Sequence, residues 1–180
     1  MAASTPPRSN FPALTPFATF QFRLSPPFLV GSLSRGTPLT VVPIHSGTVR
    51  TEEAWHKPVS EGGMGGVRIS AEVVGGGGLP VVGELGRGTS ASVDYIRIVD
   101  ITPELHIILG GNPASQSTRF GNSFINVSFE SGSEKYQDLE RAIFVGSGRF
   151  VVGNSSLMSE YKVSRVGAGS PAEDAQGDNG

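Results

Sequence analysis

The sequence of 180 residues contains no cysteine, which excludes disulfides, thiolate metal sites and a cysteine nucleophile. It also lacks an apolar run close to the ~20 residues that a membrane helix needs. Its formal net charge is only −2, and no basic cluster suits nucleic acid or an anionic membrane. Residues 11–20 lack the order of a signal peptide because Pro12 and Pro16 interrupt them. We therefore expect a cytoplasmic protein without a nucleic-acid or membrane partner.

Helical periodicity is nearly absent, and 25 glycines with 13 prolines disfavour long helices. Short β-rich runs recur instead, separated by Gly, Pro, Asn and Ser. The predicted strands are residues 17–24, 39–44, 48–51, 67–74, 91–99, 104–109, 119–130, 142–152 and 157–166. Within this set Ser46-Gly47 is interpreted as a turn, and Thr102-Pro103 as the turn of a hairpin. One helical turn is predicted over residues 134–141.

This pattern predicts an all-β domain over residues 17–166: a single closed antiparallel β-barrel of about eight strands. Closure would remove exposed strand edges, and a barrel of this size can hold one small ligand. A two-sheet sandwich stays open as an alternative. Residues 1–16 are expected to form a flexible N-terminal segment and residues 167–180 a disordered tail, because neither segment can bury enough apolar surface.

Two glycine clusters, residues 62–66 and 75–78, invite comparison with phosphate-binding loops. Neither opens a helical pattern, and no Gly-Lys-Ser/Thr follows, so flexible loops are the favoured interpretation. His45, His56 and His106 are too far apart in sequence to indicate a metal site. We therefore expect no cofactor and no metal.

Charged and polar residues inside β runs are the more informative positions. Glu72, Asp94, His106 and Glu130 are flanked by apolar residues, and Arg97 lies in the same run as Asp94. Solvated charges on a wet strand face would give the same pattern. If these side chains point inward instead, burial would raise the pKa values of the carboxyl groups and allow proton transfer near neutral pH.

Aromatic and polar neighbours would then form the walls of such a pocket. Ordinary barrel packing explains each of them equally well when it is taken alone. The predicted substrate-binding residues are His45, Trp55, Tyr95, Phe124, Asn126, Tyr136 and Tyr161.

Several segments in order resemble the DUF3237 family of small β-barrel proteins of unknown function. They are residues 42–48 (VPIHSGT), 71–77 (AEVVGGG), 129–132 (FESG), Tyr136 with Leu139, and 144–149 (FVGSGR). The likeness runs from about residue 17 to residue 166. It implies a closed antiparallel barrel and brings no established activity. The family's Glu, midchain Asp and second Glu correspond to Glu72, Asp94 and Glu130.

The chain departs from the family pattern at several positions. Ala71 and Gly75 differ within the second segment, and Asp138 and Glu140 stand where the family carries Trp and Asn. Leu79-Pro80 replaces an Asp-Trp pair. A pocket of this chain would therefore be rebuilt for a different ligand.

The barrel class is also similar to that of allene oxide cyclase, dirigent proteins and calycins, which is a fold-level analogy only. Our leading hypothesis is a cofactor-free isomerase or cyclase that acts on a small apolar metabolite. In it Asp94 or Glu130 acts as acid or base, and Arg97 or His106 polarises an oxygen. The second hypothesis is a non-catalytic barrel that binds an apolar ligand, and the third is an interaction protein with a filled interior. An outer wall rich in Val, Ile and Phe favours a homo-oligomer.

Overall fold

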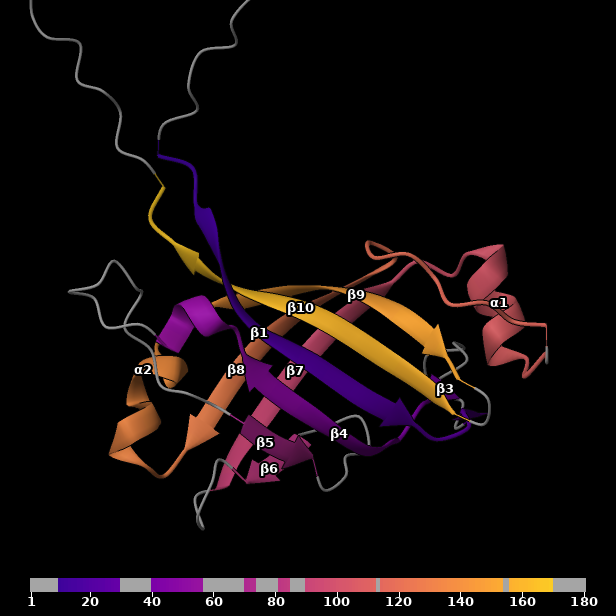
Figure 1. Ribbon diagram of the computed structural model, residues 1–180, viewed down its shortest axis with the longest axis horizontal. Coiled ribbons are helices and arrows are strands. Elements are labelled where there is room, and N and C mark those ends of the chain that lie inside the picture. Colours follow the sequence, from indigo (N-terminus) through magenta and orange to yellow (C-terminus); the bar gives the residue numbers. More distant parts are fainter. Residues whose placement is uncertain are drawn as a thin grey trace, which may run out of the picture.

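The computed structural model describes residues 10–29, 40–56, 70–73, 81–84, 90–112, 114–153 and 156–169 (Figure 1). Strands dominate this part of the chain, so the predicted all-β class is confirmed. None of the helices in these ranges is long and apolar enough to cross a membrane. The elements in chain order are β1 (Ala13–Leu24), β2 (Phe28–Leu29), β3 (Thr40–Val41), β4 (Ile44–Thr51), η1 (Glu53–His56), β5 (Ser70–Val73), β6 (Val81–Glu84), β7 (Ser90–Val99), α1 (Pro103–Leu109), β8 (Ser123–Ser131), η3 (Glu134–Tyr136), α2 (Gln137–Glu140), β9 (Phe144–Val152) and β10 (Leu157–Gly167).

Six longer strands form one antiparallel sheet in the order β4-β1-β10-β9-β8-β7. The four-residue strands β5 and β6 pair between β4 and β7, which gives the backbone the strand order of a closed barrel. This link is narrow, since Glu72 pairs with Glu84 and Val73 with Gly83 between β5 and β6. Most of the pairing in the antiparallel sheet therefore lies among the six longer strands.

β1 begins at Ala13, four residues before the predicted start of the domain, so part of the predicted flexible segment is strand. Pro16 had suggested a break, yet it pairs with Ser164 of β10. The register shifts between Pro16 and Ala18, and proline is tolerated at such bulges. As a result Phe17 and Ala18 are both buried, which breaks the alternation of the strand. At the other end of the domain, β10 runs to Gly167.

β4 is continuous, so the predicted turn at Ser46-Gly47 is wrong. Gly47 pairs with Phe22 of β1, and a Cβ at this position would collide with the main-chain oxygen of Gln21. The glycine therefore permits close approach of two strands rather than a change of direction.

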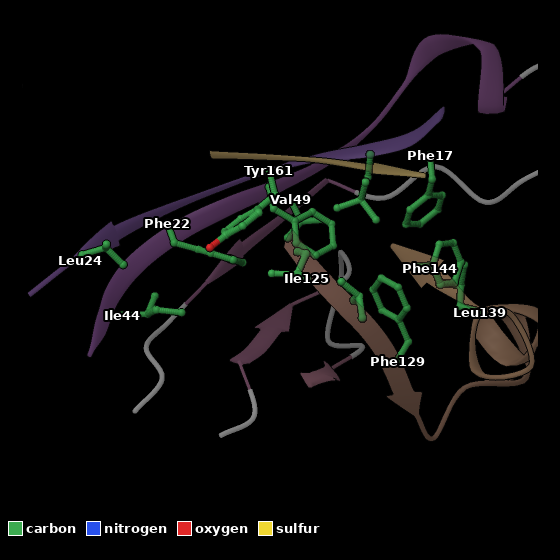
Figure 2. Packing of buried hydrophobic residues seen from close by; sticks show 14 of the residues in the cluster. Phe17, Phe22, Leu24, Ile44, Val49, Ile125, Phe129, Leu139, Phe144 and Tyr161 are labelled. Carbon is green, nitrogen blue, oxygen red and sulfur yellow. The ribbon is translucent and has the colours of Figure 1, made fainter. Parts of the chain in front are cut away.

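The barrel interior is packed with side chains from alternate strand positions (Figure 2). On β9 the buried positions are Phe144, Gly146, Gly148 and Phe150. Gly148 leaves room for the ring of Tyr161 on β10, because a Cβ at Gly148 would overlap that ring. The Tyr161 hydroxyl pairs with the buried Ser123 hydroxyl at 3.2 Å, so this phenol is hydrogen-bonded inside the core.

Residues 104–109 form helix α1 and not the predicted strand of a hairpin. The side chain of Thr102 accepts a hydrogen bond from the Leu105 backbone N–H at 3.3 Å, and Pro103 occupies the first turn. Both residues are typical of a helix start. Leu105 and Ile108 are buried on one face of the helix, which is the i, i+3 spacing of a helix that lies on a core.

The opposite end of the barrel carries η1, η3 and α2 (Figure 1). The helical turn predicted over residues 134–141 is confirmed, as η3 followed by α2. Six buried side chains gather there and form what we call the aromatic end: Phe17, Trp55, Phe129, Tyr136, Leu139 and Phe144. The ring of Phe17 lies 4.5 Å from that of Phe144 and 5.0 Å from that of Trp55, measured between centroids.

Candidate functional site

Two of the predicted catalytic side chains, His106 and Glu130, are exposed. His106 lies on α1, away from the face that buries Leu105 and Ile108. Glu130 follows Phe129 on β8, where only the odd-numbered positions from 123 to 129 are buried. The prediction that these two side chains point into the barrel is therefore wrong.

The same alternation places two predicted substrate-binding residues of β8 on the outer wall. Phe124 is 51% exposed, and Asn126 is exposed as well. The prediction of Phe124, Asn126 and Glu130 as site residues places the mixed polar face of β8 in the interior, and the structure places it outside. The fully apolar row of Ile125, Val127 and Phe129 faces the interior because it gains more from burial. His45 is likewise exposed, on β4, so none of these three predicted residues lines an interior pocket.

For Glu72, Asp94, Tyr95 and Arg97 the structure describes the backbone, and their side chains lie outside its described part. Glu72 pairs with Thr48 and Glu84, Asp94 with the exposed Ser128, and Tyr95 and Arg97 with the buried Val127 and Ile125. Directly opposite residues of an antiparallel pair belong to the same face. Asp94 and Arg97 thus occupy register positions of different faces, as strict alternation predicts, and their catalytic roles remain predictions.

The remaining predicted wall residues, Trp55, Tyr136 and Tyr161, are buried at 4%, 3% and 1% exposure. Trp55 makes an edge contact with Phe17 and lies under the Arg165 guanidinium, whose carbon is 5.9 Å from the ring centroid. The Tyr161 ring centroid is 6.3 Å from that of Phe22. These three aromatic side chains therefore belong to the buried core of the structure.

A cleft of about 980 Å³ lies at the end of the barrel that carries α1. We call this region the cleft end. Its walls come from the end of β1, the tip of the β9–β10 hairpin, and α1 with the loop that follows it, which lie together at one end of the barrel in Figure 1. The residues around the cleft are Leu24, Ser25, Pro26, Pro27, Ile108, Leu109, Gly110, Gly111, Asn112, Ser115, Val152, Gly153, Ser156 and Leu157.

The apolar wall of the cleft follows from strand register. Leu157 of β10 pairs with Val152 of β9 on one side and with Leu24 of β1 on the other. Cross-strand partners present side chains on one face, so these three form a continuous apolar row. Ile108 and Leu109 of α1 add to it. A small apolar molecule would therefore meet hydrocarbon from both the sheet and the helix.

The loop after α1 contributes Gly110, Gly111, Asn112 and Ser115 to the cleft, and we call this part the rim. Hydrogen bonds hold the rim in place. The backbone N–H groups of Gly110 and Gly111 donate to His106 and Ile108 at 3.0 Å each and end the helix. Ser117 accepts from the Val152 N–H at 3.0 Å, and Thr118 from the Phe150 N–H at 2.9 Å. The loop is thus joined to β9, and the polar side chains of the rim have defined positions.

The described residues around the cleft include no titratable side chain. Two carboxyl groups elsewhere have lowered pKa values. That of Glu52 is lowered chiefly by a hydrogen bond from Thr19, and that of Glu104 chiefly by its own backbone N–H. Within the described residues, no three His, Asp or Glu side chains lie close enough to hold a metal ion. The described residues around the cleft therefore offer apolar contact and neutral hydrogen-bonding groups.

A second hollow of about 420 Å³ lies on the outer wall of the sheet. It runs over β7, β8, β9 and β10, and its large exposed side chains are Ile98, Phe124 and Leu14, at 71%, 51% and 60% exposure. It offers mainly apolar contact and one charged side chain, that of Lys162. The polar side chains around it are those of Asn126, Ser147, Lys162 and Ser164, and the charge of Lys162 distinguishes it from the cleft, around which no described residue is charged.

Sequence reasoning missed the cleft because its residues come from segments that looked like punctuation or were assigned to the wrong element. Gly110, Gly111 and Asn112 follow a helix that was interpreted as a strand. Gly153 and Ser156 belong to the connection between two correctly predicted strands. The available signal was Thr102-Pro103 with Leu105 and Ile108, which is a capped helix with an apolar face.

The comparisons with known proteins agree with this architecture. A conserved protein of unknown function from Rhodopseudomonas palustris is similar over 88% of this chain and 99% of its own, with 18% identity and a TM-score of 0.58. A β-barrel-like protein from Acinetobacter baumannii is similar over 92% of this chain and 100% of its own, with 17% identity and a TM-score of 0.56. A protein with unknown function from Clostridium acetobutylicum is similar over 88% of this chain and 99% of its own, with 14% identity and a TM-score of 0.55.

At these identities the likeness shows the fold alone. No curated protein matches the chain. The sequence profile of a protein family of unknown function matches residues 12–166, which includes β1 through most of β10 and confirms the resemblance found in the sequence. The chain therefore belongs to the DUF3237 family.

Proposed function

We propose that this protein binds a small, largely apolar molecule in the cleft beside α1, and that the cleft itself does not transform it. The observation that carries this proposal is the composition of the cleft: apolar and neutral polar residues, and no titratable side chain among the described residues around it. This is the second of the hypotheses drawn from the sequence.

The dimensions of the cleft support small-molecule binding. Its volume of about 980 Å³ is at the upper end of the roughly 300–1,000 Å³ that is usual for such sites. Five apolar side chains, those of Leu24, Ile108, Leu109, Val152 and Leu157, can cover the body of a ligand. Small-molecule sites commonly combine such a wall with a few polar groups that fix orientation.

The isomerase or cyclase hypothesis requires an acid and a base within reach of one ligand. The exposed positions of His106 and Glu130 separate those two side chains from the interior, and neither lies among the residues around the cleft. The described residues therefore favour binding over acid–base catalysis, and the likeness to allene oxide cyclase stays an analogy of fold.

A titration with the neutral dye Nile red tests the proposal, because its fluorescence rises when it leaves water for an apolar site. We expect saturable binding, and we expect Val152→Trp to weaken it about tenfold. The large ring would occupy part of the cleft and remove apolar contact area for the dye. Val151→Trp is the matched control. Val151 is the neighbouring residue of the same type, is equally half-buried, and faces the other side of β9.

Equal weakening by Val152→Trp and Val151→Trp would contradict binding at the cleft, and so would unchanged binding in both Val152→Trp and the second filling variant, Leu157→Trp. Because a tryptophan could disturb β9 itself, both variants are compared by thermal unfolding, and Leu157→Trp serves as a second filling variant from β10. Weakening by either filling variant with an unchanged melting temperature supports the proposal.

A further inference from the structure

We infer that the cleft selects an uncharged molecule that carries a hydroxyl group, an alcohol or a phenol, over a carboxylate of the same size. This inference rests on the proposed function and deepens it by naming the ligand class. It follows from the direction of two hydrogen bonds in the loop after α1, which decide what Ser115 and Asn112 can still offer to a ligand.

Ser115 offers the rim an acceptor. Its hydroxyl lies 2.6 Å from the main-chain oxygen of Asn112. A carbonyl oxygen can only accept, so the Ser115 hydroxyl donates its proton there. The lone pairs of Ser115 Oγ are then what this side chain can present to a molecule in the cleft. A ligand must donate a hydrogen bond to use them.

Asn112 offers the rim a donor. Its side-chain oxygen accepts from the Ala114 backbone N–H at 2.9 Å. Because that N–H can only donate, it fixes which end of the amide is the oxygen. The NH₂ group is the other end, and Asn112 is also one of the residues around the cleft. A ligand must accept a hydrogen bond to use it.

A hydroxyl group can use either residue, since it donates one hydrogen bond and accepts others. A carboxylate only accepts, so it can use Asn112 but meets lone pairs at Ser115. No described residue around the cleft carries a positive charge that would compensate for the lost hydration of an anion. A molecule without any polar group would fill the same apolar row and leave both rim groups unused.

Three ligands of nearly equal shape test the inference: 2-naphthol, 2-methylnaphthalene and 2-naphthoate. Each is titrated into the full chain and followed by calorimetry and by the amide signals of Asn112 and Ser115 in NMR spectra. At neutral pH we expect 2-naphthol to bind about fivefold more tightly than 2-methylnaphthalene, from one to two net hydrogen bonds at a partly exposed rim. We expect it to bind at least about tenfold more tightly than 2-naphthoate.

Ser115→Ala should bring the affinity for 2-naphthol closer to that for 2-methylnaphthalene, because only the Asn112 NH₂ group remains as a partner, and should leave the affinity for 2-methylnaphthalene unchanged. Ser117→Ala is the matched control, because Ser117 holds the same loop to Val152 without belonging to the cleft. It should preserve the preference for the hydroxyl. If Ser115→Ala weakens all three ligands equally and the preference persists, Ser115 only shapes the loop and the inference is overturned.

The outcomes also separate this inference from the proposed function. If 2-naphthoate or 2-methylnaphthalene binds as tightly as 2-naphthol, and Val152→Trp abolishes that binding, the cleft is a ligand site and the selection for a hydroxyl is wrong. If none of the three ligands binds and Nile red also fails to bind, the proposed function falls, and the inference falls with it.

Discussion

The two ends of the barrel are closed in different ways. At the aromatic end, six large side chains are buried, and the rings of Phe129 and Phe144 lie 5.2 Å apart between centroids. At the cleft end, a helix of seven residues contributes two buried side chains, Leu105 and Ile108, and leaves a cleft of about 980 Å³ beside them. Dense packing at one end can thus support the fold while the other end keeps open volume for a ligand.

The largest expected effect is on stability at the aromatic end. Phe144 has no exposed surface and lies 4.5 Å from the Phe17 ring. We expect Phe144→Ala to lower the free energy of unfolding by about 3–5 kcal/mol, because it removes contacts and leaves a cavity. Leu157→Ala at the half-buried cleft row should cost about 1–2 kcal/mol, since less surface is buried there. Urea unfolding measures both values.

The conservative variant Phe144→Leu keeps this comparison measurable if Phe144→Ala does not fold. Equal losses at Phe144 and Leu157 would break the distinction between the two ends. A larger loss at Leu157 would mean that the cleft row carries the fold.

The next effect concerns the helix at the cleft end. Thr102 caps α1 through its side chain, whereas Ser133 occupies the same position before η3 without a side-chain cap bond. We expect Thr102→Ala to cost about 1 kcal/mol, and Ser133→Ala to cost much less. Hydrogen exchange of the α1 amides should accelerate in the Thr102 variant, and Nile red binding should weaken, because Ile108 and Leu109 form one wall of the cleft.

A Ser133→Ala variant as unstable as Thr102→Ala would show that the cap bond is not what distinguishes these two positions. Unchanged Nile red binding in a Thr102 variant with faster α1 exchange would mean that the helix wall contributes little to the site.

The strands could be predicted from the sequence because turn residues and β-rich runs alternate throughout the described domain. β7, β8, β9 and β10 were located to within a few residues for this reason. The inner face of β8 could not be assigned securely, because Phe124 and Phe129 lie on opposite faces and only the paired strands decide between them. The pairing of Val127 with Tyr95 and with Phe144 fixes the face of Val127. Because side chains alternate along a strand, it also fixes the face of each of the remaining residues of β8.

The cleft could not be predicted because it depends on where a short helix ends in space. Thr102 and Pro103 satisfy both a hairpin turn and a helix start. The spacing of Leu105 and Ile108 favours the helix, but it does not show which distant parts of the chain this helix lies beside, and the cleft depends on those contacts. The hydrogen-bond direction at Ser115 likewise requires coordinates, because the sequence shows a serine and not its partner.

The smallest expected effect is electrostatic and concerns Glu52, which lies next to the aromatic end and is partly exposed. The Glu52 backbone N–H donates to Phe17 at 2.8 Å, and its carboxylate accepts from Thr19 at 2.7 Å and lies 3.4 Å from Lys162 Nζ. The Thr19 hydrogen bond and the Lys162 charge lower the pKa of Glu52 in the folded state. The resulting stabilisation is present above the unfolded pKa, near 4.5, and is lost as the pH falls through the folded value.

Glu52→Gln should therefore reduce the free energy of unfolding at pH 7 and approach the wild type at low pH. With 38% of the Glu52 side chain exposed, solvent screening limits the difference to a few tenths of a kcal/mol. Melting temperatures at pH 7 and at about pH 3, with exposed Glu53→Gln as the control, measure the effect. A Glu52 loss as large as that of Phe144→Ala would place the stability of this end in its outer ion pair and hydrogen bonds. A loss well below 1 kcal/mol would mean that the stability of this end comes mainly from the packing of its buried rings.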